Sequence, residues 1–207
     1  MKTIFKLALA AMILFTFSCS PDTVLESQEN LEAVNAKAKK AKKATRAWRG
    51  KFSNVADLTQ SIVACEPVSE GVVLTTNVIS GNMTHLGKIQ EGSFGRPQDG
   101  TCFLTGPNSV RVIYNVNYIG AHGDQITTEE DVTIILDFDA DPNGFVGTFE
   151  NTKDGNGNPI PIKIIDGTGR FEGATGELLF KDASFGPSAS GDGTVISTWR
   201  LIGEITY

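Results

Sequence analysis

The chain has 207 residues, which is enough for one ordinary domain with a tail. Hydrophobic residues make up 40% of it, so it can bury a core and is not a disordered polypeptide. A formal net charge of -6 argues against a general nucleic-acid binder. Residues 33–51 carry eight basic and no acidic residues, whereas residues 52–207 carry eight basic and twenty acidic ones, a net -12. We therefore expect an acidic domain behind a basic linker.

The N-terminus has the features of an export signal. Lys2 and Lys6 precede an apolar stretch over residues 7–17, which is too short to span a bilayer as a mature helix. Cys19 follows between two serines, and this resembles the lipobox of bacterial lipoproteins, in which the cysteine is lipidated and becomes the mature N-terminus. The resemblance implies a signal peptide over residues 1–18 and a protein anchored through Cys19 to a cell-envelope membrane, periplasmic or surface-facing. The alternative is an ordinary cleaved signal with an incidental cysteine.

Residues 19–51 are predicted to form a tether. Its segment 30–48 is rich in Ala and Lys and lacks Gly and Pro, so the local preference is helical. Such a basic segment either rests on anionic head groups or is a solvated spacer, and we favour the spacer. The folded domain is then expected over residues 52–207.

Two cysteines remain if Cys19 is modified, namely Cys65 and Cys102. An oxidising compartment would allow them to form a disulfide, which would stabilise the fold by roughly 3–4 kcal/mol. The alternative is a pair of buried thiols. Only two histidines are present in the whole chain, which argues against a metal site at these cysteines.

All glycines except Gly50 lie in residues 52–207, mostly between β-rich runs. Turn signals containing Gly, Asn, Asp and Pro separate these runs. We expect eight strands, over residues 71–80, 84–94, 109–119, 125–138, 145–151, 160–165, 174–185 and 194–207. Strands at this spacing without a helix between them predict a sandwich or a barrel. We favour an all-β, eight-stranded antiparallel β-barrel, because closure removes the unpaired edges.

A glycine-rich segment, GTGRFEGATGELLF at residues 167–180, links two of these strands. It resembles the signature of the allene oxide cyclase barrel superfamily, which includes plant dirigent proteins. The matching residues are Gly167, Thr168, Gly169, Phe171, Gly173, Ala174 and Gly176. Glycines at this density let the backbone turn sharply, while Phe171 is expected to pack inward. A second segment, GNMTHLGK at residues 81–88, resembles one that recurs in secreted bacterial proteins with the same barrel.

Members of the superfamily with known activity cyclise a fatty-acid epoxide or guide phenolic radical coupling. Active members of the superfamily bind an apolar substrate inside the barrel and hold its conformation. The pattern of the cyclase's catalytic residues is not matched here, so no catalytic residue and no cofactor is carried over. We expect a non-catalytic, membrane-tethered barrel that either binds a small apolar ligand or simply presents a surface. The alternatives are a cyclase- or isomerase-like enzyme acting on a lipidic substrate, with Glu91, Glu177 and Glu204 as the strand carboxylates to consider, and a structural or adhesive role. The plant cyclases are oligomeric, so association is compatible with the resemblance.

Five polar residues interrupt otherwise apolar predicted strands. If several face one cavity, they would supply the oriented polar groups that a ligand pocket needs; the alternative is a structural role or exposure to solvent. These residues are Asn77, His85, Tyr114, Asn115 and Asn117.

Residues 139–150 match the calcium-loop pattern D-x-[DN]-x-[DN]-G-x5-E, with Asp139, Asp141 and Asn143 as candidate ligands. The flanks are predicted strands, so Glu150 would lie about 20 Å along an extended strand, at about 3.3 Å per residue, far from Asp139. Hairpin-turn chemistry explains the loop without an ion. We therefore favour a turn over a calcium site.

Overall fold

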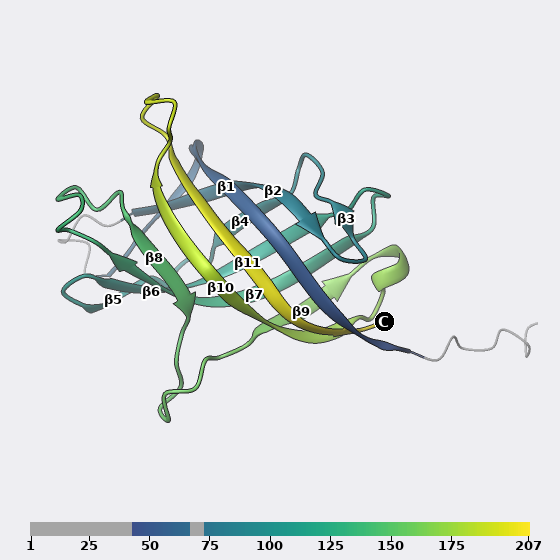
Figure 1. The fold of residues 1–207 in the computed structure, drawn as a ribbon. Coiled ribbons are helices and arrows are strands. Elements are labelled where there is room, and N and C mark those ends of the chain that lie inside the picture. The colour runs from purple at the N-terminus through teal and green to yellow at the C-terminus, as the bar shows by residue number, and fades with distance from the viewer. Residues whose placement is uncertain (1–42, 67–72) are drawn as a thin grey trace, which may run out of the picture. The chain divides into compact units, whose positions relative to one another are not determined.

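The structure is a computed structural model that describes residues 43–66 and 73–207 (Figure 1). The predicted signal peptide, Cys19 and most of the predicted tether lie outside these residues. Within the described residues, no helix is long and apolar enough to cross a membrane.

Extended strands make up most of this part of the chain, together with one short 3-10 helix, η2 (Gly169–Phe171). The strands are β1 (Thr45–Ala64), β2 (Val73–Met83), β3 (Gly87–Lys88), β4 (Phe94–Pro97), β5 (Phe103–Gly106), β6 (Ser109–Ile119), β7 (Gln125–Leu136), β8 (Gly147–Asn151), β9 (Ile162–Gly167), β10 (Thr175–Pro187) and β11 (Val195–Thr206).

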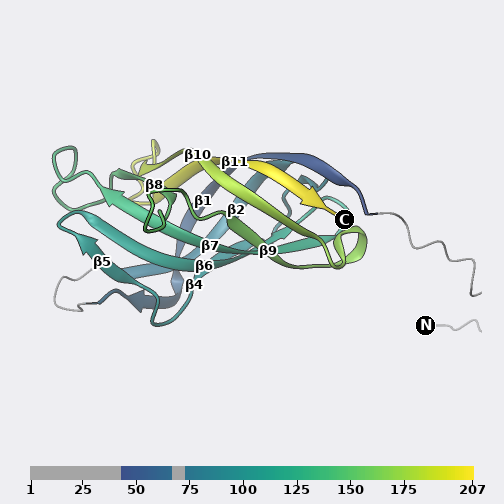
Figure 2. The same ribbon diagram turned by 90° about the horizontal axis from the view of Figure 1, so that it is seen from below.

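These strands close into an eight-stranded antiparallel barrel (Figures 1 and 2). Around the ring, β1 is followed by β2, β4, β6 and β7, and then by β10 and β11, which pairs with β1 again. Strands β8 and β9 share the position between β7 and β10, because each pairs with both of them. The short strands β3 and β5 pair with β2 and β6 outside the ring. The predicted all-β, eight-stranded antiparallel barrel is confirmed.

The start of β1 corrects the predicted helix and the domain boundary. Thr45–Trp48 was expected to end a helical segment, but β1 begins at Thr45, which lies opposite Thr206 of β11. The compact unit accordingly spans residues 43–207 and not 52–207. The physical reason is that β11 pairs with β1 from Thr45 to Val55 and β2 pairs with it from Gly50 onward, and this pairing outweighs a local helical preference of a few tenths of a kcal/mol per residue.

The predicted strand over residues 84–94 is also wrong. His85 (φ 67) and Gly92 (φ 89) adopt left-handed backbone conformations, which interrupt a continuous strand. Only β3 and the first residue of β4 are extended in this segment. In contrast, β6 has the predicted bounds, and β7 differs only in ending at Leu136.

The glycine-rich corner closes the end of the barrel at which β1 begins and β11 ends (Figure 1). Phe171 is fully buried there, and its ring centroid lies 6.0 Å from that of Trp48 and 4.8 Å from that of Tyr207. We call these three rings the aromatic plug. Outside it, Arg170 covers the Phe171 ring and pairs with Asp124 at 2.7 Å. Phe171 thus packs inward as expected.

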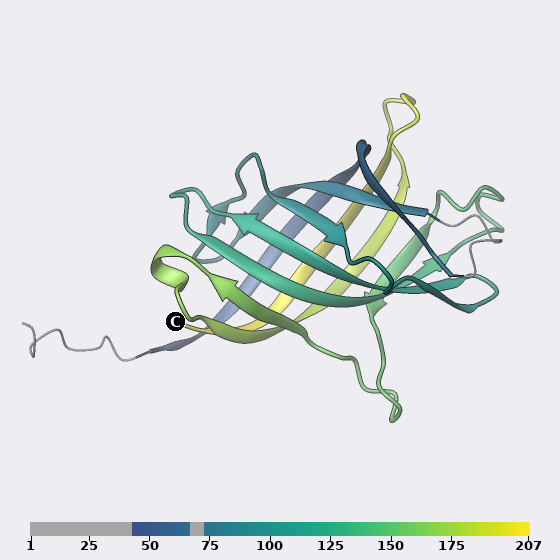
Figure 3. The same ribbon diagram turned by 180° about the vertical axis from the view of Figure 1, so that it is seen from behind.

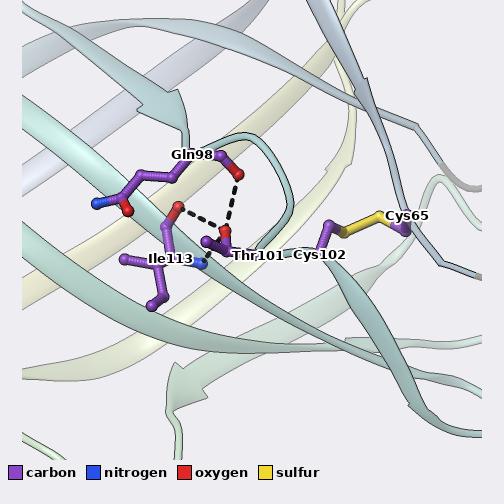
Figure 4. Close-up of a disulfide and its surroundings, with 5 residues drawn as sticks. All are labelled: Cys65, Gln98, Thr101, Cys102 and Ile113. Carbon is purple, nitrogen blue, oxygen red and sulfur yellow. Dashed lines mark hydrogen bonds between the residues drawn. A yellow bond between two sulfur atoms is a disulfide. The ribbon is translucent and has the colours of Figure 1, made fainter.

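A disulfide lies beyond the other end of β1 (Figure 4). Cys65 and Cys102 are joined with their Cα atoms 4.5 Å apart, and both are buried. The backbone N–H of Glu66 donates to the carbonyl of Cys102 at 2.9 Å, and the N–H of Leu104 donates to the carbonyl of Glu66 at 2.9 Å. The bridge and these hydrogen bonds attach the end of β1 to β5.

Candidate functional site

The inner face of the barrel carries an unusual carboxylate. Alternation along β6 and β7 places Tyr114, Tyr118, Thr128 and Glu130 on the inside, and the strand register sets Tyr114 directly opposite Glu130. Glu130 is only 4% exposed. A carboxyl group at such a position costs free energy unless it is paired or protonated.

Hydroxyl groups are the partners that Glu130 has. Tyr118 donates a hydrogen bond to its Oε1 at 3.0 Å, and Thr128 donates to the same oxygen at 2.8 Å. Within the described part of the chain, no Lys or Arg pairs with Glu130, and its Oε2 accepts no hydrogen bond from a side chain. Burial raises the pKa of Glu130 to about 7, against the opposing effect of the two hydroxyl donors. This carboxyl group can therefore exchange a proton near neutral pH.

The two tyrosines beside Glu130 stay protonated over the same range. Burial raises the pKa of both Tyr114 and Tyr118, and the charge of Glu130 raises them further. The side chain of Asn77 interacts with the hydroxyl of Tyr114 and lowers its pKa, which offsets part of this increase. Near neutral pH, the tyrosine hydroxyls are thus hydrogen-bond donors in the lumen and not anions.

Two polar atoms in the same part of the barrel lack partners. The indole Nε1 of Trp199 and the Oδ1 of Asn54 are buried, and neither makes a hydrogen bond of ordinary geometry to a described residue; the Trp199 N–H lies close enough to the Tyr118 hydroxyl to lower the pKa of that group. Phe52 lies opposite Trp199 across the β1–β11 pair, and Asn54 is the next inward position on β1. An unsatisfied buried polar group costs about 1–3 kcal/mol, so two of them side by side require an explanation.

Aromatic contacts join these groups across the barrel. The Phe52 ring lies between Trp199, at a centroid distance of 5.5 Å, and Tyr118, at 5.1 Å. Figure 3 shows the corresponding walls, with the teal strands β6 and β7 in front of blue β1 and yellow β11. We call the whole group the luminal polar cluster: Asn54, Asn77, Tyr114, Tyr118, Thr128, Glu130 and Trp199.

Three residues of the luminal polar cluster retain some exposure, whereas Tyr118, Thr128, Glu130 and Trp199 are buried. Asn54, Asn77 and Tyr114 are half-buried although they face inward, whereas Trp48 and Phe171 are completely buried. The cluster thus combines aromatic rings with the carboxyl group of Glu130, the N–H donor of Trp199 and the acceptor Oδ1 of Asn54. Such an arrangement suits a small, largely apolar molecule with a polar head.

Only two of the five predicted ligand-binding residues, Asn77 and Tyr114, belong to this cluster. Asn115 and Asn117 lie on the outer face, where Asn115 accepts a hydrogen bond from Gln98 at 2.9 Å and Asn117 donates to Gln125 at 3.3 Å.

His85 is also separate from the luminal polar cluster. It lies in the turn after β2, its ring centroid is 6.1 Å from that of Tyr207, and its carbonyl accepts a hydrogen bond from Arg170 at 2.7 Å. Its left-handed backbone gives it a structural place in this turn.

The sequence reasoning missed Glu130, although a signal was available. Thr128 and Glu130 share the parity of Ile126 and Val132, which are apolar and buried, so period two places all four on one face. The strand carboxylates that were considered instead are all exposed to solvent: Glu91, Glu177 and Glu204.

The loop between β7 and β8 is a self-contained turn. Oδ1 of Asp141 accepts a hydrogen bond from the backbone N–H of Asn143 at 3.0 Å, and Oδ2 accepts one from the N–H of Phe145 at 3.1 Å. The hydrogen bonds from the Asn143 and Phe145 backbone hold the pKa of Asp141 below its usual range. Glu150 lies on β8 and pairs with Lys153. No three His, Cys, Asp or Glu side chains gather at metal distance in the part of the chain described, Asp139 included.

Two surface hollows adjoin this loop, with volumes of about 520 and 320 Å³. Both are lined by Asn108, Leu136 and Phe138, and the larger also by Asp137 and Asp139. These two carboxylates are exposed, so the hollows offer no desolvated charged group comparable with Glu130.

No protein family, no curated protein and no solved structure matches the chain.

Proposed function

We propose that this chain is an exported, lipid-anchored β-barrel that binds a small, largely apolar molecule through the luminal polar cluster. One observation carries the proposal: Trp199 Nε1 and Asn54 Oδ1 are buried on adjacent strands, and neither makes a hydrogen bond of ordinary geometry. A ligand with an oxygen acceptor and a hydrogen-bond donor would satisfy both atoms. The surrounding rings would contact its apolar body.

The binding proposal is tested on the mature chain purified from its own host. Native mass spectrometry should detect a retained small molecule in the wild type, and Asn54→Ala and Trp199→Phe should both lower its occupancy. Asn115→Ala is the matched control, because this asparagine lies on the outer face, and its occupancy should equal that of the wild type. Equal occupancy in all four proteins, or no retained molecule and no binding of added apolar ligands, would refute the proposal.

Export and anchoring are supported by the lysines, apolar stretch and cysteine of the N-terminus. The buried Cys65–Cys102 bridge supports an oxidising compartment, because disulfides persist there. The closed barrel and the inward Phe171 support the resemblance of residues 167–180 to the allene oxide cyclase barrel superfamily.

Anchoring is tested by Cys19→Ser. This variant should move from the membrane fraction to the soluble fraction and should no longer incorporate a labelled fatty acid, whereas Ser20→Ala should behave as the wild type. Unchanged fractionation of the Cys19→Ser protein would contradict lipidation.

Glu130 favours a second candidate function, a cyclase or isomerase acting on a lipidic substrate. A carboxyl group that titrates near pH 7 can transfer a proton to or from a bound molecule. If the retained molecule is a substrate, incubation in deuterated water should label it at carbon, and Glu130→Gln should abolish the labelling while binding persists. An unlabelled molecule recovered intact supports binding alone.

A further inference from the structure

We infer that the ligand of the luminal polar cluster carries a protonated amine, held against the carboxylate of Glu130. The inference rests on the proposed binding function and narrows its ligand class. It starts from a charge balance: Glu130 is 4% exposed, and no cationic side chain of the described residues faces it. A carboxylate in such surroundings needs either a proton or a cation.

The hydrogen bonds at Glu130 favour the ionised form, because both hydroxyl donors lower the pKa of this carboxyl group. Tyr118 and Thr128 both donate to Oε1, and an ionised carboxylate is purely an acceptor. Oε2 accepts no side-chain hydrogen bond in the described part of the chain, and it is left for a donor from the ligand. An ammonium group is the donor that also neutralises the charge.

The other side chains around the luminal polar cluster also suit a cation. The rings of Phe52, Tyr118 and Trp199 adjoin one another, and aromatic faces attract cations. The unpaired Oδ1 of Asn54 is a further acceptor for an amine N–H. Trp199 Nε1 is a donor and cannot pair with an ammonium, so the same ligand should also carry a hydroxyl or carbonyl oxygen.

Charge discriminates between ligand classes. Residues 52–207 have a net charge of -12, and such a field attracts cations and repels anions. A fatty acid would place a second carboxylate beside Glu130, and like charges at close range repel strongly in a poorly solvated site. An apolar amine avoids this repulsion.

The amine inference predicts a dependence on pH. Glu130, Tyr114 and Tyr118 are the titratable side chains that the described strands bring together in the luminal polar cluster. The tyrosines stay neutral because burial raises their pKa, so Glu130 alone changes charge around neutrality. The affinity for an amine should therefore rise between pH 5.5 and 8, as Glu130 ionises.

Three probes with one apolar chain test the inference: octylamine, octanol and octanoate, titrated calorimetrically into the delipidated mature protein at pH 7.5. Octylamine should bind about tenfold or more tightly than the other two, as expected for a desolvated charge pair. Glu130→Gln should weaken octylamine about tenfold and leave octanol unchanged, which also shows that the variant is folded. Glu129→Gln is the matched control on the outer face of β7, and its affinities should equal those of the wild type.

The outcomes separate the two proposals. If octanol or octanoate binds as tightly as octylamine, or if Glu130→Gln leaves octylamine affinity unchanged, the amine inference is overturned while binding in the barrel stands. If none of the three probes binds and the purified chain retains no small molecule, the binding function itself fails.

Discussion

The hydroxyl of Tyr118 donates a hydrogen bond of 3.0 Å to Oε1 of Glu130, inside a barrel wall that is otherwise largely apolar. The carboxyl group therefore has a neutral partner where an ion pair would be expected. This relationship ties both the stability of the fold and its ligand preference to the protonation of one residue.

The stability of the barrel should decrease as the pH rises through neutrality. The pKa of Glu130 is raised by burial from 4.5 to about 7, so the folded chain binds this proton more tightly than the unfolded chain. The resulting stabilisation is complete below pH 4.5 and is lost as the pH passes 7; the shift corresponds to about 3 kcal/mol. Urea unfolding between pH 4 and 8.5 should show this loss in the wild type.

Glu130→Gln supplies the comparison for that measurement. The variant lacks the titrating group, so its free energy of unfolding should change by about 3 kcal/mol less over the same range. Glu129→Gln should follow the wild type. Parallel curves for the wild type and Glu130→Gln would show that the carboxyl group does not titrate in this window.

The two tryptophans of the chain provide a matched pair. The indole N–H of Trp48 donates to the carbonyl of Thr84, whereas that of Trp199 makes no hydrogen bond of ordinary geometry to a described residue. Substitution by Phe removes the same atoms in both cases, but only Trp48→Phe leaves a carbonyl group without its donor. Trp48→Phe should lower the free energy of urea unfolding by about 1–2 kcal/mol more than Trp199→Phe does. A larger loss for Trp199→Phe would indicate that its N–H is bonded in solution.

The backbones of β10 and β11 approach each other closely at Gly176, so a side chain at this position should destabilise the fold. Gly176 lies opposite Ile205, and a Cβ atom at Gly176 would run into the backbone carbonyl of Glu204 on β11. Gly176→Ala should therefore lower the free energy of unfolding by about 1–3 kcal/mol, as overpacking does.

Gly186 is the control for that substitution. It lies in the same strand, has no atom within 4 Å of an added Cβ and does not adopt a left-handed conformation. Thermal melts of both variants provide the measurement. In them, Gly186→Ala should change the free energy of unfolding by no more than about 0.5 kcal/mol. Equal destabilisation by both substitutions would argue against the β10–β11 approach.

The disulfide should contribute measurably to stability. Replacing Cys65 and Cys102 together by Ser should cost about 2–4 kcal/mol in urea unfolding, because the unfolded chain then loses the constraint on a loop with a sequence separation of 37. Dithiothreitol should shift the wild type by a similar amount and leave the double variant unchanged. A wild type insensitive to the reductant would contradict a role for the bridge.

The local sequence pattern was sufficient to predict the central strands β6 and β7, but it was insufficient to predict β1. β6 and β7 alternate apolar and polar residues, and this alternation predicts their positions. β1 places Trp48 and Phe52 inward among basic and small residues, a composition that also suits a helix. Its strand conformation depends on pairing with β2 and β11, both distant in sequence, and propensity does not report such contacts.

The candidate site was predicted only in part for a related reason. Tyr114 and Asn77 stood out as polar residues in apolar runs. Glu130 lies in a segment with several neighbouring acidic residues, where only the strand register separates the inward carboxyl group from the outward ones. Trp199 and Asn54 are unexceptional in the sequence, because an unpaired hydrogen-bonding atom becomes apparent only in three dimensions.

The register of β1 also determines how the barrel resists mechanical load. β1 pairs with β11 from Thr45 to Val55 on one side and with β2 from Gly50 onward on the other. A pull applied to Thr45 along the axis of this strand loads the ladders on both flanks in shear, and they must yield together. Tension along β1 therefore meets collective resistance from two ladders.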